Sequence, residues 1–176
     1  MPQASGHRPV FLVGFMGAGK TSVGRSLGRR LGWSFEDLDD RIQGRAGCSV
    51  AEIFRDFGEA EFRRLENVAL RELLTELSTG PRVVALGGGA FAQPGTAALL
   101  EDAGAHIIFL DAPAEELFRR CQQEQRVRPL LQDAKQFREL YGQRRSSYLK
   151  ASCRIDTSGK DVDGVAAEVA CRIGLE

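Results

Sequence analysis

Short apolar segments alternate with longer amphipathic segments along almost the whole chain. Five segments rich in apolar or β-branched residues are predicted to be strands: 9–14, 33–37, 82–87, 105–111 and 153–157. The first, third and fourth are continuously apolar, which is typical of strands buried on both faces of a parallel sheet. Apolar residues at helical spacing predict helices at 21–32, 50–77 with a break near Gly58, 94–103, 112–121 and 162–173. This alternation predicts an α/β fold in which helices cover a parallel sheet through right-handed crossovers.

The composition is that of an ordinary globular domain. The chain has 176 residues, of which 43% are hydrophobic and 27% charged. Its 24 basic and 24 acidic side chains cancel, so we expect neither nucleic acid nor a membrane as a partner. Residues 1–8 lack the apolar centre of a signal peptide, and no apolar run has the length of a membrane span. The four cysteines form no CxxC pair and are interpreted as reduced thiols of a cytoplasmic protein.

One glycine-rich segment, GFMGAGKT at 14–21, stands between the first predicted strand and the first predicted helix. It satisfies the pattern G-x-x-x-x-G-K-[ST] in the context that a phosphate-binding loop (P-loop) requires. Glycines let successive backbone N–H groups point at an anion, and the helix that follows adds the positive end of its dipole. Lys20 is expected to reach the β- and γ-phosphates, and the Thr21 hydroxyl to ligate Mg²⁺. The segment predicts a nucleoside triphosphate site formed by Gly17, Ala18, Gly19, Lys20, Thr21 and Ser22.

Other features narrow the class of P-loop protein. The chain has no N-K-x-D motif, which GTPases use to read the base. Segment 107–111, IIFLD, resembles the apolar strand that ends in a carboxylate in many ATPases. Because it leads directly into a helix start that contains proline, Asp111 is interpreted as a helix-start or loop residue. The polar segment 122–133, with two arginines and a proline, is expected to be a mobile surface loop, typical of a small kinase with a lid.

Six short motifs occur in the order and approximate spacing of the shikimate kinase family: GFMGAGKTSVG (14–24), DLD (37–39), FRR (62–64), GGGA (87–90), RPLL (128–131) and RRSSY (144–148). The resemblance extends from about Val10 to Ile173. It implies phosphorylation of the 3-hydroxyl of shikimate by ATP with Mg²⁺, in the pathway to chorismate and the aromatic amino acids. It also implies a three-layer P-loop kinase fold like that of nucleoside monophosphate kinases, with a five-stranded parallel sheet in the order 2-3-1-4-5. A single domain at 1–176 would carry a substrate-binding subdomain at about 38–66 and a lid at about 121–133, and family precedent favours a monomer.

The resemblance assigns roles on the substrate side. Asp39 matches the residue that contacts the substrate hydroxyls and accepts the proton, and a carboxylate can do both. Arg63 and Arg144 match the two arginines that bind the shikimate carboxylate, and a planar guanidinium can do so bidentately. Gly88 and Gly89 match the turn whose backbone approaches the substrate.

Further roles concern the transferred phosphoryl group. Asp37 matches a residue that helps to hold Mg²⁺. Arg128 matches the lid arginine that closes over the phosphates, where its cation, with that of Lys20, would stabilise the charge of the transition state. Arg126 lies close in sequence and is an alternative to Arg128.

The adenine side is assigned through two more segments. Arg120 matches a residue near the adenine, but one extra residue in the lid leaves Arg119 as an alternative. The segment 156–160 resembles the loop on the adenine side, which makes Lys160 a candidate contact to the base.

Two alternative functions remain open at this point. A gluconate kinase shares the P-loop, the small size and a substrate that carries a carboxylate, and the motifs DLD, FRR and GGGA favour shikimate over gluconate. A regulatory module that binds ATP without catalysis would have little use for Asp39.

Overall fold

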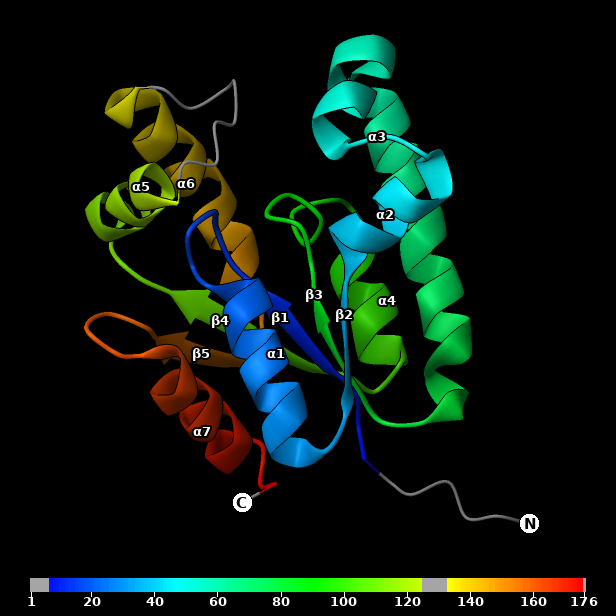
Figure 1. Ribbon diagram of the computed structural model, residues 1–176, viewed down its shortest axis with the longest axis vertical. Coiled ribbons are helices and arrows are strands. Elements are labelled where there is room, and N and C mark those ends of the chain that lie inside the picture. The colour runs from blue at the N-terminus through cyan, green and yellow to red at the C-terminus, as the bar shows by residue number, and fades with distance from the viewer. Residues whose placement is uncertain (1–6, 125–132, 176) are drawn as a thin grey trace.

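The structure, a computed structural model, describes residues 7–124 and 133–175. Its centre is a parallel sheet of five strands in the order β2-β3-β1-β4-β5 (Figure 1). The strands are β1 (Val10–Val13), β2 (Ser34–Asp37), β3 (Arg82–Ala85), β4 (His106–Asp111) and β5 (Cys153–Asp156). Each strand lies inside one of the five segments predicted above, so the fold class and the strand order 2-3-1-4-5 are confirmed.

The central strands are buried on both faces. Every residue of β1 is at most 1% exposed. Val10 pairs with Val83 of β3 on one side and with His106 of β4 on the other. The continuous apolar runs of β1 and β4 therefore contribute side chains to the core on both faces of the sheet, as their sequences predicted.

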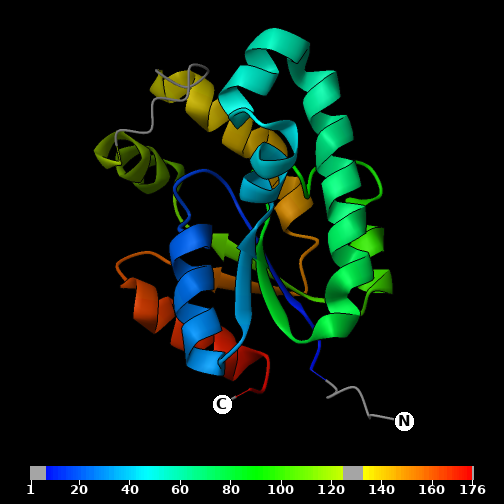
Figure 2. The same ribbon diagram turned by 45° about the vertical axis from the view of Figure 1, so that its right-hand side comes forward.

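Helices cover the sheet in two outer layers (Figures 1 and 2). Within the described residues they are α1 (Lys20–Leu31), α2 (Leu38–Ala46), α3 (Val50–Thr75), α4 (Thr96–Asp102), α5 (Ala114–Gln123), α6 (Ala134–Tyr148) and α7 (Val162–Arg172), with a 3₁₀ turn η1 (Glu76–Thr79). Helices α1 and α7 lie side by side on one face, where Ser26 Oγ donates a hydrogen bond of 2.5 Å to Asp163 Oδ1. Helices α4 and α6 lie behind the sheet on the other face, which gives the predicted three layers.

Helix α3 is long and is interrupted where the sequence predicted a break. It begins with a capping box, in which Glu52 N donates to Ser49 Oγ (3.1 Å) and Ser49 N donates to Glu52 Oε2 (2.7 Å). Gly58 has φ 84° and ψ 174°, which are not helical values. The segment before the break stands with α2 above the carboxyl edge of the sheet (Figure 2).

The hydrophobic pattern gave no prediction for α2 and no bounds for α6. Helix α2 buries only Leu38 and Ile42 among polar neighbours, so its periodic signal is weak. Its start is fixed locally instead, because Asp37 Oδ1 accepts a hydrogen bond from Asp39 N (2.9 Å). Helix α6 is polar along most of its surface and buries Phe137 and Tyr148 at its two ends.

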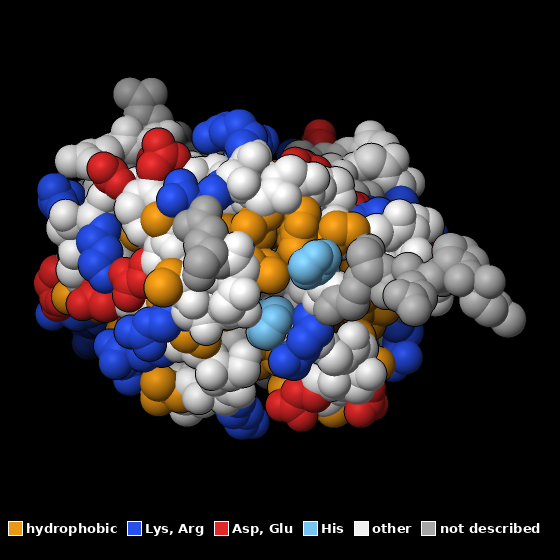
Figure 3. All heavy atoms as spheres, turned by 90° about the horizontal axis from the view of Figure 1, so that it is seen from below, with side chains coloured by type: hydrophobic (Ala, Val, Ile, Leu, Met, Phe, Trp, Pro, Cys, Tyr) orange, Lys and Arg blue, Asp and Glu red, His pale blue; other side chains and the backbone are white. Residues whose placement is uncertain are grey.

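The amino edge of the sheet forms the face seen in Figure 3. Both histidines of the chain lie there among hydrophobic side chains, with Lys or Arg and Asp or Glu around them. The His7 ring lies 5.5 Å from the Trp33 ring, and Arg8 Nε donates to the Gly104 carbonyl oxygen (2.5 Å). This face carries charges of both signs, and neither sign forms a continuous patch.

Candidate active site

The loop between β1 and α1 has the backbone of a phosphate-binding loop. Gly17 has φ +80°, and a Cβ there would lie 2.7 Å from the Leu117 carbonyl oxygen, so the position requires glycine. The next residue, Ala18, is buried, whereas Ser22 in the first turn of α1 is exposed. Gly19 caps α1 without a side-chain hydrogen bond. The first N–H groups of the helix are therefore not bound by a capping side chain and can bind an anion.

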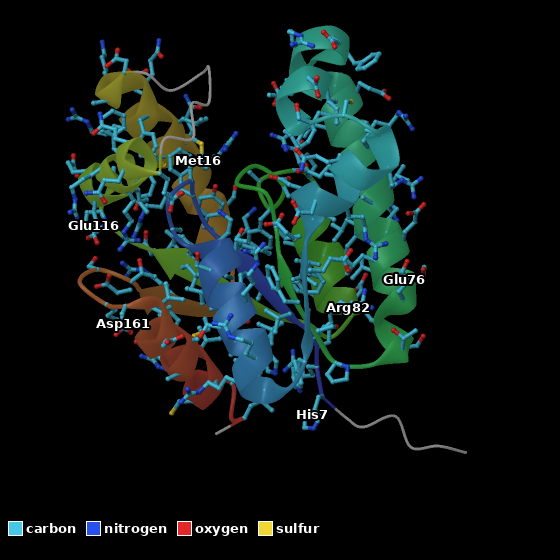
Figure 4. All side chains as sticks on the ribbon, viewed as in Figure 1. His7, Met16, Glu76, Arg82, Glu116 and Asp161 are labelled. Carbon is cyan, nitrogen blue, oxygen red and sulfur yellow. The ribbon has the colours of Figure 1, made fainter. Side chains whose placement is uncertain are left out.

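The Lys20 ammonium lies over this loop. Its Nζ donates hydrogen bonds to the carbonyl oxygens of Gly14 (2.8 Å) and Phe15 (3.1 Å). Met16, at the tip of the loop, is labelled in Figure 4 and is largely buried. A positive charge is thus held beside the backbone that would surround the phosphates.

Thr21 and Asp37 meet at the end of the loop. The Thr21 hydroxyl donates a hydrogen bond of 2.7 Å to Asp37 Oδ2, and Asp37 Oδ1 caps α2. Two oxygen atoms on different elements, one of them in a carboxylate, form the kind of ligand set that Mg²⁺ uses together with phosphate and water. In the described part of the chain, no three Asp, Glu, His or Cys side chains form a cluster that could hold a metal by themselves.

The glycine turn after β3 brings two of the predicted substrate residues together. A Cβ at Gly87 would lie 2.9 Å from Asp39 Oδ1, and one at Gly88 would lie 3.4 Å from Arg144 Nη1. The same position at Gly88 is 3.8 Å from the Gly14 carbonyl oxygen of the P-loop. The turn therefore lies between the P-loop and these two charged side chains.

The same turn is enclosed by two further side chains. The Arg63 guanidinium approaches Gly89 so closely that a Cβ there would overlap Nη2. The Tyr148 hydroxyl donates a hydrogen bond to the Gly88 carbonyl oxygen. Burial raises the pKa of Tyr148 to about 12, so this hydroxyl keeps its proton at neutral pH. Three helices, α2, α3 and α6, thus direct polar side chains at one short backbone segment.

A buried carboxylate at this site was missed by the sequence analysis. Glu66 is 3% exposed, and its Oε1 accepts a hydrogen bond from Arg63 Nη1 (2.8 Å). Its Oε2 is buried and has no hydrogen-bond partner among the described residues. Burial raises the pKa of Glu66, the charge of Asp39 adds to the rise, and Arg63 and Arg144 oppose it. Its position three residues after Arg63, on the same face of a helix, was the available signal.

Arg120 joins the P-loop to the loop after β5. Its Nη1 donates to the Gly17 carbonyl oxygen (3.3 Å) and to Thr157 Oγ1 (3.1 Å), and its Nη2 pairs with Glu116 (2.6 Å). The neighbouring Arg119 is exposed. The geometry therefore favours Arg120 over Arg119 as the arginine that faces the nucleotide side.

One predicted residue, Lys160, pairs with a carboxylate on α7, and two others fall outside the described part of the chain. Lys160 Nζ lies 2.6 Å from Glu168 Oε2 on α7. Arg126 and Arg128 lie outside the described residues, as does most of the predicted lid. The roles predicted for these three residues stay predictions.

The prediction that Asp111 is a helix-start or loop residue is wrong. Asp111 is the last residue of β4, pairs with Asp156 of β5, and is 2% exposed. Its carboxylate accepts hydrogen bonds from Tyr141, Arg145 and Arg154. Helix α5 begins three residues later, so pairing with β5 and burial among these donors, and not the following proline, determine its conformation.

Known proteins resemble the chain over nearly its whole length. A family model described as shikimate kinase matches residues 16–173. The shikimate kinase of Geobacter sulfurreducens is 43% identical over 173 residues, which cover 97% of this chain and 93% of that protein. Shikimate kinase from Acinetobacter baumannii in complex with shikimate has TM-score 0.87 and 33% identity, covering 96% of this chain and 93% of that one. Shikimate kinase from Aquifex aeolicus has TM-score 0.82 and 30% identity, covering 94% and 96%.

Proposed function

The chain belongs to the shikimate kinase family, and we propose that it transfers the γ-phosphoryl group of ATP to the 3-hydroxyl of shikimate. The observation that carries this proposal is the glycine turn after β3. It brings one carboxylate, Asp39, and two guanidinium groups, Arg63 and Arg144, together beside the P-loop. A small ring acid with hydroxyl groups suits this combination, because guanidinium binds a carboxylate and a carboxylate accepts hydrogen bonds from hydroxyls.

The nucleotide would lie along the P-loop. The backbone N–H groups at 17–22 would hold the β- and γ-phosphates, and Lys20 would leave its carbonyl partners for phosphate oxygens. Arg120 lies between the loop and the residues after β5, which supports a position beside the adenine. Arg128 remains our candidate for the lid cation.

The donor set at the end of the P-loop fits Mg²⁺. Thr21 Oγ1 and Asp37 Oδ2 are already 2.7 Å apart, and both are hard oxygen donors. When bound, Mg²⁺ would neutralise negative charge on the triphosphate. Asp37 would hold the cation while continuing to cap α2 through its other oxygen.

The substrate would be held by its two ends. Arg63 and Arg144 would bind the carboxylate, with Gly88 and Gly89 close to the ring. Asp39 would orient the 3-hydroxyl toward the γ-phosphate. As the hydroxyl oxygen bonds to phosphorus and the bond from phosphorus to ADP breaks, the hydroxyl proton passes to the Asp39 carboxylate.

Glu66 would orient Arg63 and would take no part in the phosphoryl transfer itself. Its Oε1 accepts a hydrogen bond from Arg63 Nη1, and this pairing orients the guanidinium beside the glycine turn. Because Arg63 carries the compensating charge, Glu66 can stay buried as a carboxylate beside Asp39.

An assay of ATP consumption with shikimate, quinate, gluconate and nucleoside monophosphates tests the proposal. We expect turnover with shikimate that exceeds turnover with the other compounds. Turnover of gluconate in place of shikimate would transfer the assignment to a gluconate kinase. ATP binding without turnover of any acceptor would favour a regulatory module.

We also propose an oligomeric state and a cellular location for the protein. We propose that the enzyme is active as a monomer, and size-exclusion chromatography with light scattering would test this. None of the helices at 7–124 and 133–175 is both long enough and apolar enough to cross a membrane. We propose that the enzyme acts in the cytoplasm, where ATP and the preceding metabolite are available, and that it needs neither nucleic acid nor a membrane.

A further inference from the structure

An ionic cluster around one buried carboxylate lies at the carboxyl end of β4, away from the glycine turn. The Asp111 carboxylate accepts hydrogen bonds from the Tyr141 hydroxyl (2.9 Å), Arg145 Nη2 (3.0 Å) and Arg154 Nε (2.8 Å). Tyr141 and Arg145 belong to α6, whereas Arg154 belongs to β5. Arg145 Nε also donates to the Tyr141 hydroxyl (3.2 Å). One carboxylate thus joins α6 to the edge of the sheet through two side chains one helical turn apart.

The same helix carries Arg144 and Tyr148 on a different face. These two residues are also one turn apart, and both reach the glycine turn. Because successive residues of an α-helix are separated by about 100°, the direction of Arg145 determines the direction of Arg144. The rotation of α6 that lets Tyr141 and Arg145 meet Asp111 is therefore the rotation that directs Arg144 at the substrate side.

Apolar packing alone would not fix this rotation. Phe15 of the P-loop lies beneath α6, with its ring 4.9 Å from that of Phe137 and 5.5 Å from that of Tyr141. The Arg144 Cζ lies 5.8 Å from the centre of the same Phe15 ring. Edge-to-face ring contacts are weaker than hydrogen bonds to a charged group, so they restrain the rotation less. Hydrogen bonds to a charged carboxylate are directional, and Asp111 itself is only 2% exposed.

We propose that Asp111 is a positioning residue for the substrate carboxylate. By holding Tyr141 and Arg145, it fixes the rotation of α6 and so directs Arg144 toward the ring acid. This inference rests on the proposed function, because it takes Arg144 as a ligand of the substrate carboxylate. Arg154 serves as an internal contrast, since it binds the same carboxylate from β5 and, within the described residues, makes no direct hydrogen bond or ion pair with α6.

Isothermal titration of shikimate into the wild type and three variants tests the proposal. Asp111→Asn removes the charge of the acceptor, and Arg145→Met removes the donor on α6. Both are expected to weaken shikimate binding about tenfold, because a misdirected Arg144 would lose part of a charge-assisted hydrogen bond to the substrate carboxylate. Arg154→Met is expected to change it by less than about twofold. Titration with Mg²⁺ and ADP should give similar affinities for all four proteins.

The outcomes separate this proposal from the proposed function. If the wild type does not bind shikimate, the proposed function fails first. If the wild type binds it and Arg145→Met binds it equally well, the positioning role of Asp111 is overturned while the function stands. Equal weakening by Arg145→Met and Arg154→Met would also overturn it, because the cluster would then act only through overall stability. Arg145→Met keeps the buried carboxylate and its other two partners, so it decides the question even if Asp111→Asn does not fold.

Discussion

The phosphate side and the substrate side of the proposed site are built in different ways. The phosphate side is one contiguous loop at 14–21, whose backbone and single ammonium do the binding. The substrate side combines side chains from α2, α3 and α6 around a glycine turn. A backbone site depends on the conformation of a few local residues, whereas a side-chain site depends on how distant helices are held. Changes on the substrate side should therefore alter affinity for the ring acid and leave nucleotide binding intact.

The largest effect is expected from Asp39→Asn. The amide keeps the size of the side chain but can no longer accept the hydroxyl proton. We expect kcat to fall by about 10²–10⁴-fold, the usual contribution of a positioned base. Affinity for ATP, measured by titration, should be nearly unchanged.

The matched control for this variant is Asp40→Asn. Asp40 is the next residue of α2 and is exposed. It should retain wild-type kcat. Equal loss of kcat and of ATP affinity in Asp39→Asn would show that Asp39 supports the structure and not the reaction.

The next largest effect is expected from Gly89→Ala. Gly89 is not among the glycines with positive φ, so alanine fits the backbone there. Its Cβ would displace the end of the flexible Arg63 side chain and so move a proposed substrate ligand. We expect KM for shikimate to rise about 10- to 100-fold, with KM for ATP unchanged.

Gly44→Ala is the control for a glycine replaced by alanine on the same side of the molecule. A Cβ at Gly44 in α2 would meet no atom within 4 Å. This variant should keep both KM values and gain a little helix stability. A loss of thermal stability in Gly89→Ala with no change in KM for shikimate would contradict the assigned position of Arg63.

A smaller effect is expected from Glu66→Gln. The amide can still accept a hydrogen bond from Arg63 but loses the charge attraction, so KM for shikimate should rise about fivefold, or roughly 1 kcal/mol.

Because burial raises the pKa of Glu66 above its ordinary value of 4.5, the unfolded chain releases this proton at lower pH than the folded protein does. Stability relative to Glu66→Gln should therefore fall as pH rises above about 4.5.

Urea unfolding of both proteins at pH 4.5 and pH 7.5 measures this dependence. The midpoint of the wild type relative to the variant should be lower at the higher pH. A relative midpoint that increases with pH would show that the partnership with Arg63 outweighs burial.

The phosphate side could be predicted from sequence because its information is local. Gly14 and Gly19 set the backbone conformation of the loop, and Lys20 and Thr21 supply its chemical groups. The strand before the loop is a continuous apolar run. The strand order also followed from the resemblance to a known family.

The substrate side was predicted only in part because its supports are long-range. Resemblance named Asp39, Arg63 and Arg144, which the structure brings together. It did not name Glu66, which pairs with Arg63 through a helical spacing that many surface ion pairs share. Asp111 was misassigned because its partners lie about 30 to 43 residues away in sequence. Burial of a charge cannot be read from the residues next to it.

An ion-pair network at the base of α3 connects the substrate side to the sheet. Arg41, two residues after Asp39 in α2, binds both carboxylate oxygens of Glu76 at 3.0 and 2.7 Å. Arg82 lies 3.4 Å from the same carboxylate, and Glu76 and Arg82 are both labelled in Figure 4. The hydrogen bonds from Arg41 lower the pKa of Glu76 to about 2 from its ordinary value of 4.5. The network therefore contributes stability above about pH 4.5 and loses it as pH falls toward 2.

The smallest effect is expected from Glu76→Gln, because the Glu76 side chain is 44% exposed and solvent screens its charge. Its thermal midpoint should be slightly below that of the wild type at pH 7, and the difference should shrink as pH falls toward 2, where about half of the wild-type carboxylate is protonated. Glu72→Gln, which removes an exposed pair with Arg45, is the control and should change the midpoint even less. Since Arg41 adjoins Asp39 and not the P-loop, any change in KM should concern shikimate. An equal rise in KM for ATP would mean that the two sides of the site are not supported independently.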